Sequence, residues 1–285
     1  MTDNYRIIIS SKGKSFEISR TSGAHLTEGG LKGFDSPSFD VSVCPYAAQH
    51  GGYIQKRRFS ERELSITFEI ERPLSDTLRR SLVSMLDPTE DCVIDMEIGS
   101  IHRKITAALC DEPVFSHPTF ADPTEVTLYF IAPSVFFTAE NDTAYRLRDK
   151  KSLFTFPLTF MSSAGMTPGI FISNGTAVIN NPGDSECGAV ITMTATGGDI
   201  VNPKISLGNE YILCLLTVHD GDELIIDTRA RMRNILLNGE RCFSFDKNSK
   251  FFSLPVGESP VTMSCDSGME YSETVVSFTP VYYGV

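Results

Sequence analysis

Residues 221–264 constrain the fold most, because this stretch breaks into short apolar segments separated by turn-forming residues. Residues 223–227 and 232–237 each have an apolar centre and are expected to form strands. Asn238-Gly239 follows, and both residues tolerate a positive φ, which strongly favours a tight hairpin turn. Gly257 marks another turn, after which apolar and polar side chains alternate over residues 261–264. The pattern predicts part of an antiparallel β-sandwich.

The length of the chain and further strand patterns indicate two domains. Either half of 285 residues is long enough to bury its own core. Residues 63–71 alternate most clearly between apolar and polar side chains, which predicts a strand with one buried face. A single helix is expected to follow, with Ser75 as its N-cap and Pro88 just beyond its end. We place the first domain at residues 1–137 and the second at residues 138–285, and expect no helix after Leu86.

Several segments are expected to form the remaining strands and connections. In the first domain, residues 5–10, 39–43 and 126–131 are predicted strands, the middle one half-buried, and Gly29-Gly30 with Gly33 mark a loop. Residues 92–98 and 101–109 form a predicted hairpin through a type II′ turn at Gly99-Ser100. The charged run 146–151 is interpreted as a connector. In the second domain, residues 187–196 and 275–283 are predicted strands, and the apolar run 211–218 is predicted to be a central one.

Residues 44–58 do not fit a packed strand, because the segment combines Pro45, two adjacent glycines and a basic triplet with little that could pack internally. Two interpretations stay open: a solvated loop or hairpin tip, and an arm that reaches a neighbouring subunit. The second would give a role to five residues, namely Gly51, Gly52, Lys56, Arg57 and Arg58.

The sequence contains no recognisable set of catalytic residues, so we expect no enzyme activity, no cofactor and no metal site. Nucleophile-elbow, zinc-protease and phosphate-loop motifs are all missing. The acidic residues Asp220, Asp222, Glu223 and Asp227 are interpreted as turn and strand-end residues, with calcium binding and glycoside hydrolysis as alternatives. The seven cysteines form no C-x-x-C pair and are expected to be free thiols of a reducing compartment.

Charge and hydropathy exclude several partners. A net charge of −11 argues against specific nucleic-acid binding, which requires a basic surface, and suits a surface past which DNA slides without sticking. The sequence has no apolar run of transmembrane length and no signal-peptide pattern at Met1-Thr-Asp-Asn. We therefore expect no membrane partner and synthesis in a cytoplasm.

The second half of the chain resembles the C-terminal domain of the distal tail proteins of long-tailed bacteriophages or prophages. The residues that carry the resemblance are, in order, Asp222, Leu224, Ile226, Asp227, Asn238, Gly239, Ser249, Phe251, Phe252, Leu254 and Gly257. The family commonly has Asn two places after the last glycine, where this chain has Ser259, so the final turn is expected to differ. Arg62 with the strand after it, and Ala132-Pro133 at the end of the first domain, resemble the family's N-terminal half.

The resemblance implies a mainly β protein with an N-terminal β-sandwich-like domain carrying one helix and a C-terminal galectin-like, jelly-roll antiparallel β-sandwich. It implies a structural virion protein that forms a homohexameric ring at the distal end of the tail tube, assembled in the bacterial host cytoplasm. Its implied partners are other copies of itself, the tail tube protein, a tail-tip or tail-associated protein, and receptor-binding or peripheral baseplate proteins outside the ring. DNA would pass through the channel. The region that matches residues 44–58 is a belt-like arm of the ring in that family.

A carbohydrate-binding module is the main alternative, since β-sandwiches often recognise host cell-wall glycans. Such sites usually offer an aromatic platform, most often Trp, and this chain has no Trp. Tyrosine could substitute, and the candidates are Tyr211, Tyr271, Tyr282 and Tyr283. A hydrolase of the same wall is a third hypothesis.

Overall fold

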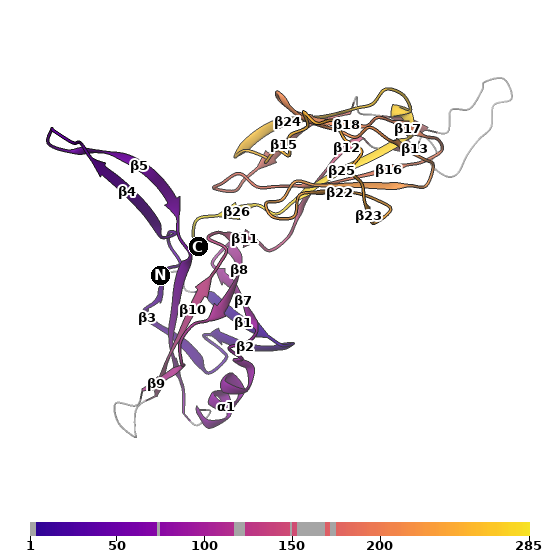
Figure 1. The fold of residues 1–285 in the computed structure, drawn as a ribbon. Coiled ribbons are helices and arrows are strands. Elements are labelled where there is room, and N and C mark those ends of the chain that lie inside the picture. The colour runs from indigo at the N-terminus through magenta and orange to yellow at the C-terminus, as the bar shows by residue number, and fades with distance from the viewer. Residues whose placement is uncertain (1–3, 73–74, 117–122, 149, 153–168, 172–174) are drawn as a thin grey trace, which may run out of the picture. The chain divides into compact units, whose positions relative to one another are not determined.

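The computed structural model describes residues 4–72, 75–116, 123–148, 150–152, 169–171 and 175–285 (Figure 1). The chain divides into two compact units, Met1–Glu140 with Val281–Val285, and Asn141–Pro280. Both units consist mainly of antiparallel strands, so the predicted mainly β fold class is confirmed. The domain boundary after residue 137 stays a prediction. No sequence pattern predicts that the last residues of the chain, Val281–Val285, return to the first unit.

The first unit is built on one antiparallel sheet in the order β2-β1-β7-β8-β10-β6-β3. The short strands β9, β11 and β26 extend it, with β26 paired to β11. The elements are β1 (Tyr5–Ser11), β2 (Lys14–Ser19), β3 (Ala24–Lys32), β6 (Arg62–Ile70), α1 (Ser75–Met85), β7 (Asp91–Ile98), β8 (Ile101–Leu109), β9 (Val114–Ser116), β10 (Thr124–Ala132), β11 (Phe137–Ala139) and β26 (Val281–Tyr282). A separate pair, β4 (Phe39–Pro45) and β5 (Gly52–Phe59), joins only to itself.

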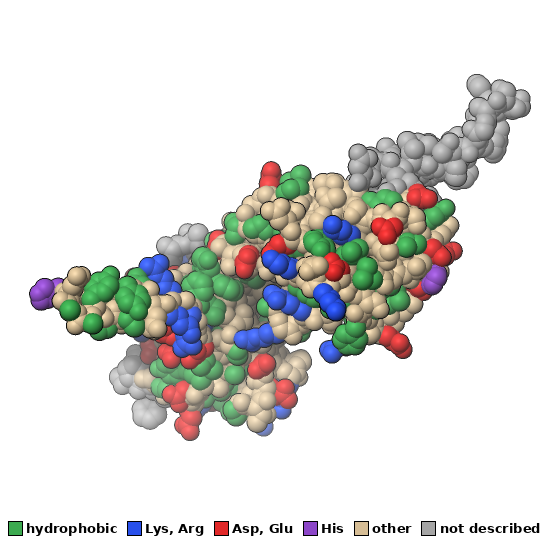
Figure 2. Space-filling model, turned by 45° about the horizontal axis from the view of Figure 1, so that its top comes forward, with side chains coloured by type: hydrophobic (Ala, Val, Ile, Leu, Met, Phe, Trp, Pro, Cys, Tyr) green, Lys and Arg blue, Asp and Glu red, His purple; other side chains and the backbone are tan. Residues whose placement is uncertain are grey.

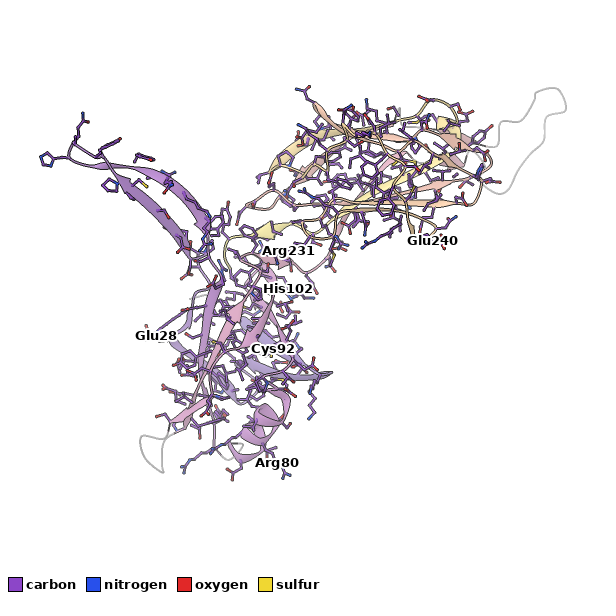
Figure 3. All side chains as sticks on the ribbon, viewed as in Figure 1. Glu28, Arg80, Cys92, His102, Arg231 and Glu240 are labelled. Carbon is purple, nitrogen blue, oxygen red and sulfur yellow. The ribbon has the colours of Figure 1, made fainter. Side chains whose placement is uncertain are left out.

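The core of this unit is one cluster of inward-facing apolar side chains. The alternation in β6 places Leu64, Ile66, Phe68 and Ile70 inside, as predicted, because successive side chains of a strand point to opposite faces. Helix α1 contributes Leu82 and Met85 to the same cluster, and Pro88 lies just beyond its end, as predicted. Figure 3 labels buried Cys92 within the sheet and exposed Arg80 on the helix.

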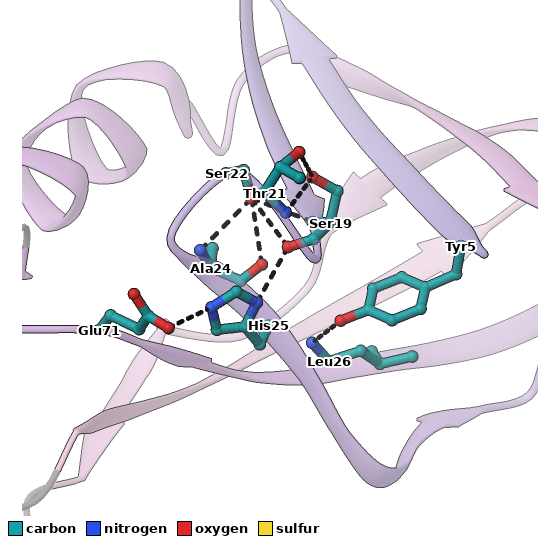
Figure 4. Close-up of polar contacts among 8 residues, drawn as sticks. All are labelled: Tyr5, Ser19, Thr21, Ser22, Ala24, His25, Leu26 and Glu71. Atoms are coloured by element: carbon teal, nitrogen blue, oxygen red, sulfur yellow. Dashed lines mark hydrogen bonds and ion pairs between the residues drawn. The ribbon is translucent and has the colours of Figure 1, made fainter. Parts of the chain in front are cut away.

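Gly29 and Gly30 lie within β3, so this part of the predicted loop is wrong, whereas Gly33 lies just beyond the end of β3. Pairing of β3 with β6 shifts register between Leu26 and Leu31, which accommodates the glycines as a bulge. Figure 4 shows how side chains hold this region: the Tyr5 hydroxyl accepts the Leu26 N–H at 3.0 Å, and His25 Nε2 lies 2.7 Å from Glu71 Oε1. A Cβ on Gly30 would lie 2.2 Å from the Thr67 carbonyl oxygen, so the bulge requires glycine there.

The second unit is a sandwich of a six-stranded sheet, β12-β25-β16-β21-β22-β23, and a four-stranded sheet, β15-β24-β18-β19. Met263 of β24 joins the two sheets, since its Sδ lies 3.4 Å from Ser272 Oγ of β25. The strands are β12 (Thr143–Arg148), β13 (Lys150–Ser152), β14 (Gly169–Phe171), β15 (Thr176–Asn181), β16 (Val190–Ala195), β17 (Ile200–Val201), β18 (Lys204–Leu207), β19 (Glu210–Leu213), β20 (Thr217–Val218), β21 (Glu223–Asp227), β22 (Asn234–Leu237), β23 (Glu240–Arg241), β24 (Gly257–Ser264) and β25 (Ser272–Phe278), and a 3₁₀ turn spans Met269–Tyr271.

Two turn predictions are confirmed. Strands β22 and β23 join through Asn238 and Gly239, whose φ values are 51° and 82°. The Asn238 side chain also accepts the Glu223 N–H at 2.9 Å, which ties the turn to β21. In the first unit, β7 and β8 join at Gly99, whose φ is 62°.

Three strand predictions need correction. The run 211–218 is divided between β19 and β20, and β19 is an edge strand and not a central one. The supposed connector 146–151 includes the end of β12, which pairs with β25 and buries Leu147. The predicted half-buried strand 39–43 is β4, whose apolar side chains are exposed.

Candidate functional site

The most unusual feature of the first unit is the β4–β5 hairpin, which we call the arm (residues 39–59). Its two strands pair with each other from Phe39 opposite Phe59 to Pro45 opposite Gly52, and with no other described strand. The arm therefore begins earlier than the predicted segment 44–58, because the alternation of residues 39–43 belongs to a strand that lies outside the main sheet.

The two predicted glycines shape the tip of the arm. Gly51 has φ +94°, and its carbonyl oxygen accepts the Tyr46 N–H at 3.1 Å. A Cβ on Gly52 would lie 2.5 Å from the carbonyl oxygen of Cys44 on the opposite strand. Both positions thus require glycine for local backbone reasons.

The arm exposes an unusual number of large apolar side chains. Phe39 is 68% exposed, Val43 61% and Tyr53 52%. In Figure 2 hydrophobic side chains cover much of the arm, with Lys and Arg near its base. An open groove of about 530 Å³ runs along it, lined by Phe39, Val41, Ile54, Arg57, Arg58 and Phe59. Contiguous exposed apolar surface of this kind marks an interaction site in soluble proteins.

The three predicted basic residues have different surroundings. Arg58 is engaged within the arm, since its side chain forms an ion pair of 3.0 Å with Asp40 on the opposite strand. Lys56 and Arg57 are exposed and form no ion pair with the described part of the chain. The structure therefore leaves two of the three predicted cations available to a partner.

A buried arginine, Arg62, lies at the base of the arm. In the sequence it belongs to a motif that resembles the family, but no structural role was predicted for it. Arg62, the first residue of β6, is 1% exposed, and its Nη2 donates to the Tyr283 carbonyl oxygen. Its guanidinium carbon lies 4.7 Å from the centre of the Phe137 ring. Burial lowers the pKa of Arg62. Phe59 packs against Tyr283 with ring centres 5.6 Å apart, so the arm begins beside the returning C-terminal residues.

The acidic side chains within the segment 220–227 form contacts at turns and strand ends, as interpreted from the sequence. Asp220 Oδ1 accepts the Gly197 N–H at 2.6 Å, and Asp222 Oδ1 accepts from Asn238 Nδ2 at 2.8 Å. The Asn238 amide is the main cause of a lowered pKa at Asp222. Asp227 pairs with Arg229 at 2.6 Å. Within the described ranges, no three or more His, Cys, Asp or Glu side chains are grouped so that they could hold a metal ion.

The four tyrosines proposed as a glycan platform do not form one. Tyr211 donates to Asp246 Oδ2 at 2.7 Å, and Tyr271 lies against Gly198, both in the second unit. Tyr282 and Tyr283 belong to the first unit, where the Arg103 guanidinium covers the Tyr282 ring at 3.4 Å. Glycan binding by other residues of the second unit stays a hypothesis.

The seven cysteines are free, and three of them, Cys92, Cys187 and Cys214, are buried. Burial raises the pKa of Cys214 to about 12 and that of Cys187 to about 11, which keeps both thiols protonated and unreactive. Of the described helical segments, none has the length and apolar character needed to cross a membrane.

Comparison with known families addresses the second unit directly. Residues 182–282 match the family described as the siphovirus-type tail component, C-terminal domain. This part of the chain is therefore similar to the siphovirus-type tail components. The match spans β16 to β26, with the Asn238-Gly239 hairpin and the resembling residues from Asp222 to Gly257 inside it. The recognition of a distal-tail-type component from the sequence is confirmed.

The fold of the chain is also similar to solved phage proteins. The Dit protein of phage SPP1, described as a paradigm of the hub adsorption apparatus in phages that infect Gram-positive bacteria, is 12% identical, with a TM-score of 0.67 over 96% of this chain and 98% of that one. A chain of the phage P2 baseplate in its activated conformation with calcium is 10% identical, with a TM-score of 0.45 over 96% of this chain and 97% of that one. No curated protein sequence matches. The similarity to the SPP1 protein covers both units of the fold.

Proposed function

We propose that this chain is a structural hub protein of a siphovirus-type tail, and that copies of it form a homohexameric ring at the distal end of the tail tube. The ring would connect the tube protein with tail-tip and host-adsorption proteins. The tail-component family of residues 182–282 and the hub-like fold support the tail location. The virion is then where the chain works, after assembly in the host cytoplasm, and it does so without catalysis.

The exposed apolar surface of the arm is the observation that supports a ring of several copies. A two-stranded hairpin on its own is at best marginally stable in water. The arm nevertheless exposes Phe39, Val43 and Tyr53. A neighbouring copy that covers these side chains would supply the missing apolar contact. If the surface that receives the arm is a different part of the neighbouring copy, the contact is heterologous, and its repetition closes a ring when the rotation fits.

The ring can be tested by reversing the two free cations of the arm. We expect Lys56→Glu with Arg57→Glu to raise the protein concentration below which rings dissociate by at least about tenfold. The new carboxylates would face a neighbouring copy of the same acidic chain, and like charges at an interface are strongly unfavourable. The Arg58–Asp40 pair is left intact so that the hairpin itself keeps its contacts. Size-exclusion chromatography with light scattering measures the mass over a dilution series.

The matched control is Arg72→Glu with Arg80→Glu, which makes the same change in net charge at exposed positions of the first unit outside the arm. This variant should assemble as the unmodified protein does. An unchanged hexamer mass in the arm variant would remove the arm from the interface. A lone monomer at all concentrations in the unmodified protein would count against the ring itself.

The assembled ring is expected to bind duplex DNA weakly or not at all. The net charge of −11 repels the phosphate backbone, and a channel for the genome must not retain it. Gel-shift titration of the ring with a random-sequence duplex at low and moderate salt measures this. Tight binding that weakens steeply with salt would contradict the proposed passage of DNA.

A further inference from the structure

A second surface, on the edge of the six-stranded sheet, has features that the ring does not use. We call it the β23 groove and define it by Arg233, Asn234, Ile235, Arg241, Phe243 and Phe251, which line an open cavity of about 140 Å³. β23 is the last strand of the sheet, so one side of the groove is a sheet edge. All of these residues belong to the second unit.

The backbone holds the groove in a defined shape. Pairing places Arg241 opposite Leu236, and the Cys242 N–H donates to the Ile235 carbonyl oxygen at 2.8 Å, which extends the β22–β23 pair. Phe251 and Phe245 pack edge to face with ring centres 6.4 Å apart and form the apolar floor. The groove is therefore a feature of the folded sandwich.

Most of the arginines around the groove have no counter-ion among the residues that the structure describes. Arg229 forms an ion pair with Asp227 at 2.6 Å, whereas Arg231, Arg233 and Arg241 are exposed and pair with no described acidic residue. Figure 3 labels Arg231 in the loop before β22 and Glu240 in the hairpin after it. Three unpaired arginines within eleven residues are unexpected on a chain of net charge −11, because intramolecular carboxylates are abundant.

Exposed apolar side chains accompany these cations. Phe243 is 80% exposed and Met232 58%. Arg, Met and aromatic residues together are the composition of protein–protein interface centres, where a few of them provide most of the affinity. A polyanionic polymer would be held by the cations alone and would leave Phe243 without a function.

We propose that the β23 groove binds an acidic segment of another protein that carries an apolar side chain. Carboxylates of the segment pair with Arg233 and Arg241, whose planar guanidinium groups bind carboxylates in bidentate geometry. The apolar side chain enters the cavity, whose 140 Å³ is close to the ~150 Å³ known to hold a benzene ring. Asn234 Oδ1 is buried and has no hydrogen-bond partner among the described residues, so it is free to accept an N–H from the segment.

The test uses the full chain and a library of random dodecapeptides displayed on phage particles. Peptides rich in Asp and Glu with at least one aromatic or branched aliphatic residue are expected to be enriched. Their dissociation constants, measured by fluorescence anisotropy with synthetic peptides, should rise at least about tenfold for Arg233→Glu with Arg241→Glu and for Phe243→Ser. Arg72→Glu with Arg80→Glu is the matched charge control and should bind as the unmodified chain does.

Three results would overturn the proposal: no acidic class of peptide enriched, enriched peptides that bind the Arg233→Glu, Arg241→Glu variant equally well, or binding that persists in Phe243→Ser. Poly(glycerol phosphate) that binds through the arginines, with no contribution from Phe243, would assign the groove to an anionic wall polymer instead. Self-association lost in the same variants would assign it to a second copy of the chain. The proposal rests on the proposed hub function only in placing the partner within a phage tail. Light scattering of each variant measures ring formation separately from peptide binding, so failure of one is distinguishable from failure of the other.

Discussion

A protein that lacks Val281–Val285 is expected to lose about 3 kcal/mol or more of unfolding free energy in its first unit. A hydrogen bond to a buried charged group contributes about 1.5–3 kcal/mol, and further contacts of the five residues add to this loss. Arg62 donates from Nη2 to Tyr283, and its Nε and Nη1 are buried without a hydrogen-bond partner among the described residues. Truncation would leave the whole guanidinium without a described acceptor. It also removes β26 from β11 and the bond from the Val285 N–H to the Phe34 carbonyl oxygen.

Amide hydrogen exchange, followed by mass spectrometry, separates the two units. Protection in β6 and β10 should fall by roughly a hundredfold or more, because each 1.4 kcal/mol is a factor of ten in the opening equilibrium. Amides in β16 and β21 of the second unit provide the internal control and should keep their exchange rates. Equal protection in the first unit with and without the five residues would contradict the anchoring role of Tyr283.

The role of Arg62 is isolated by a double-mutant cycle with Arg62→Met. Methionine occupies a similar volume and needs no acceptor, so we expect this change to recover a large part of the stability that truncation removes. In the full-length chain Arg62→Met should lower the unfolding free energy only slightly, because the Tyr283 carbonyl loses its donor. Strict additivity of the two changes would show that the effect of truncation does not pass through the buried guanidinium.

Local patterns predicted the elements whose side chains face one core. Leu64 to Ile70 alternate because a single buried face selects them, and Asn238-Gly239 have positive φ because the hairpin requires it. The alternation of residues 39–43 predicted the strand β4 correctly and its burial wrongly. Period-two alternation identifies a strand with two different faces, but it does not say whether the chain itself covers either face.

Contacts between parts of the chain that are far apart in the sequence could not be predicted from local sequence patterns. Nothing near Arg62 indicates that its acceptor lies 221 residues later, and nothing in residues 281–285 indicates a return to the first unit. The arginines of residues 229–241 are visible in the sequence, but whether each finds a counter-ion depends on where the 36 acidic residues lie after folding. Gly51 and Gly52 could be singled out from the sequence, because the need for glycine at a tight turn depends only on the local backbone.

The substitution of Gly33 by alanine is expected to destabilise the first unit strongly. Gly33 has φ +81°, and a Cβ there would lie 2.0 Å from the Glu63 carbonyl oxygen, a backbone atom of β6. Backbone cannot rotate away as a side chain does, so Gly33→Ala must displace β3 from β6 or distort both. We expect a loss of about 2–5 kcal/mol, the sum of about 1–2 kcal/mol for a non-glycine residue at positive φ and about 1–3 kcal/mol for overpacking.

Gly29→Ala is the matched control, because Gly29 also has positive φ, at +67°, but a Cβ there meets nothing within 4 Å. It carries the conformational cost alone, about 1–2 kcal/mol. Urea unfolding followed by circular dichroism, with hydrogen exchange in β6 to assign the loss to the first unit, measures the difference between the two variants. If both lose the same stability, the close approach of Gly33 to Glu63 does not constrain the fold, and β3 and β6 have room to separate. A larger loss at Gly33 would place a tight backbone contact of the first unit next to Arg62, at the base from which the arm extends.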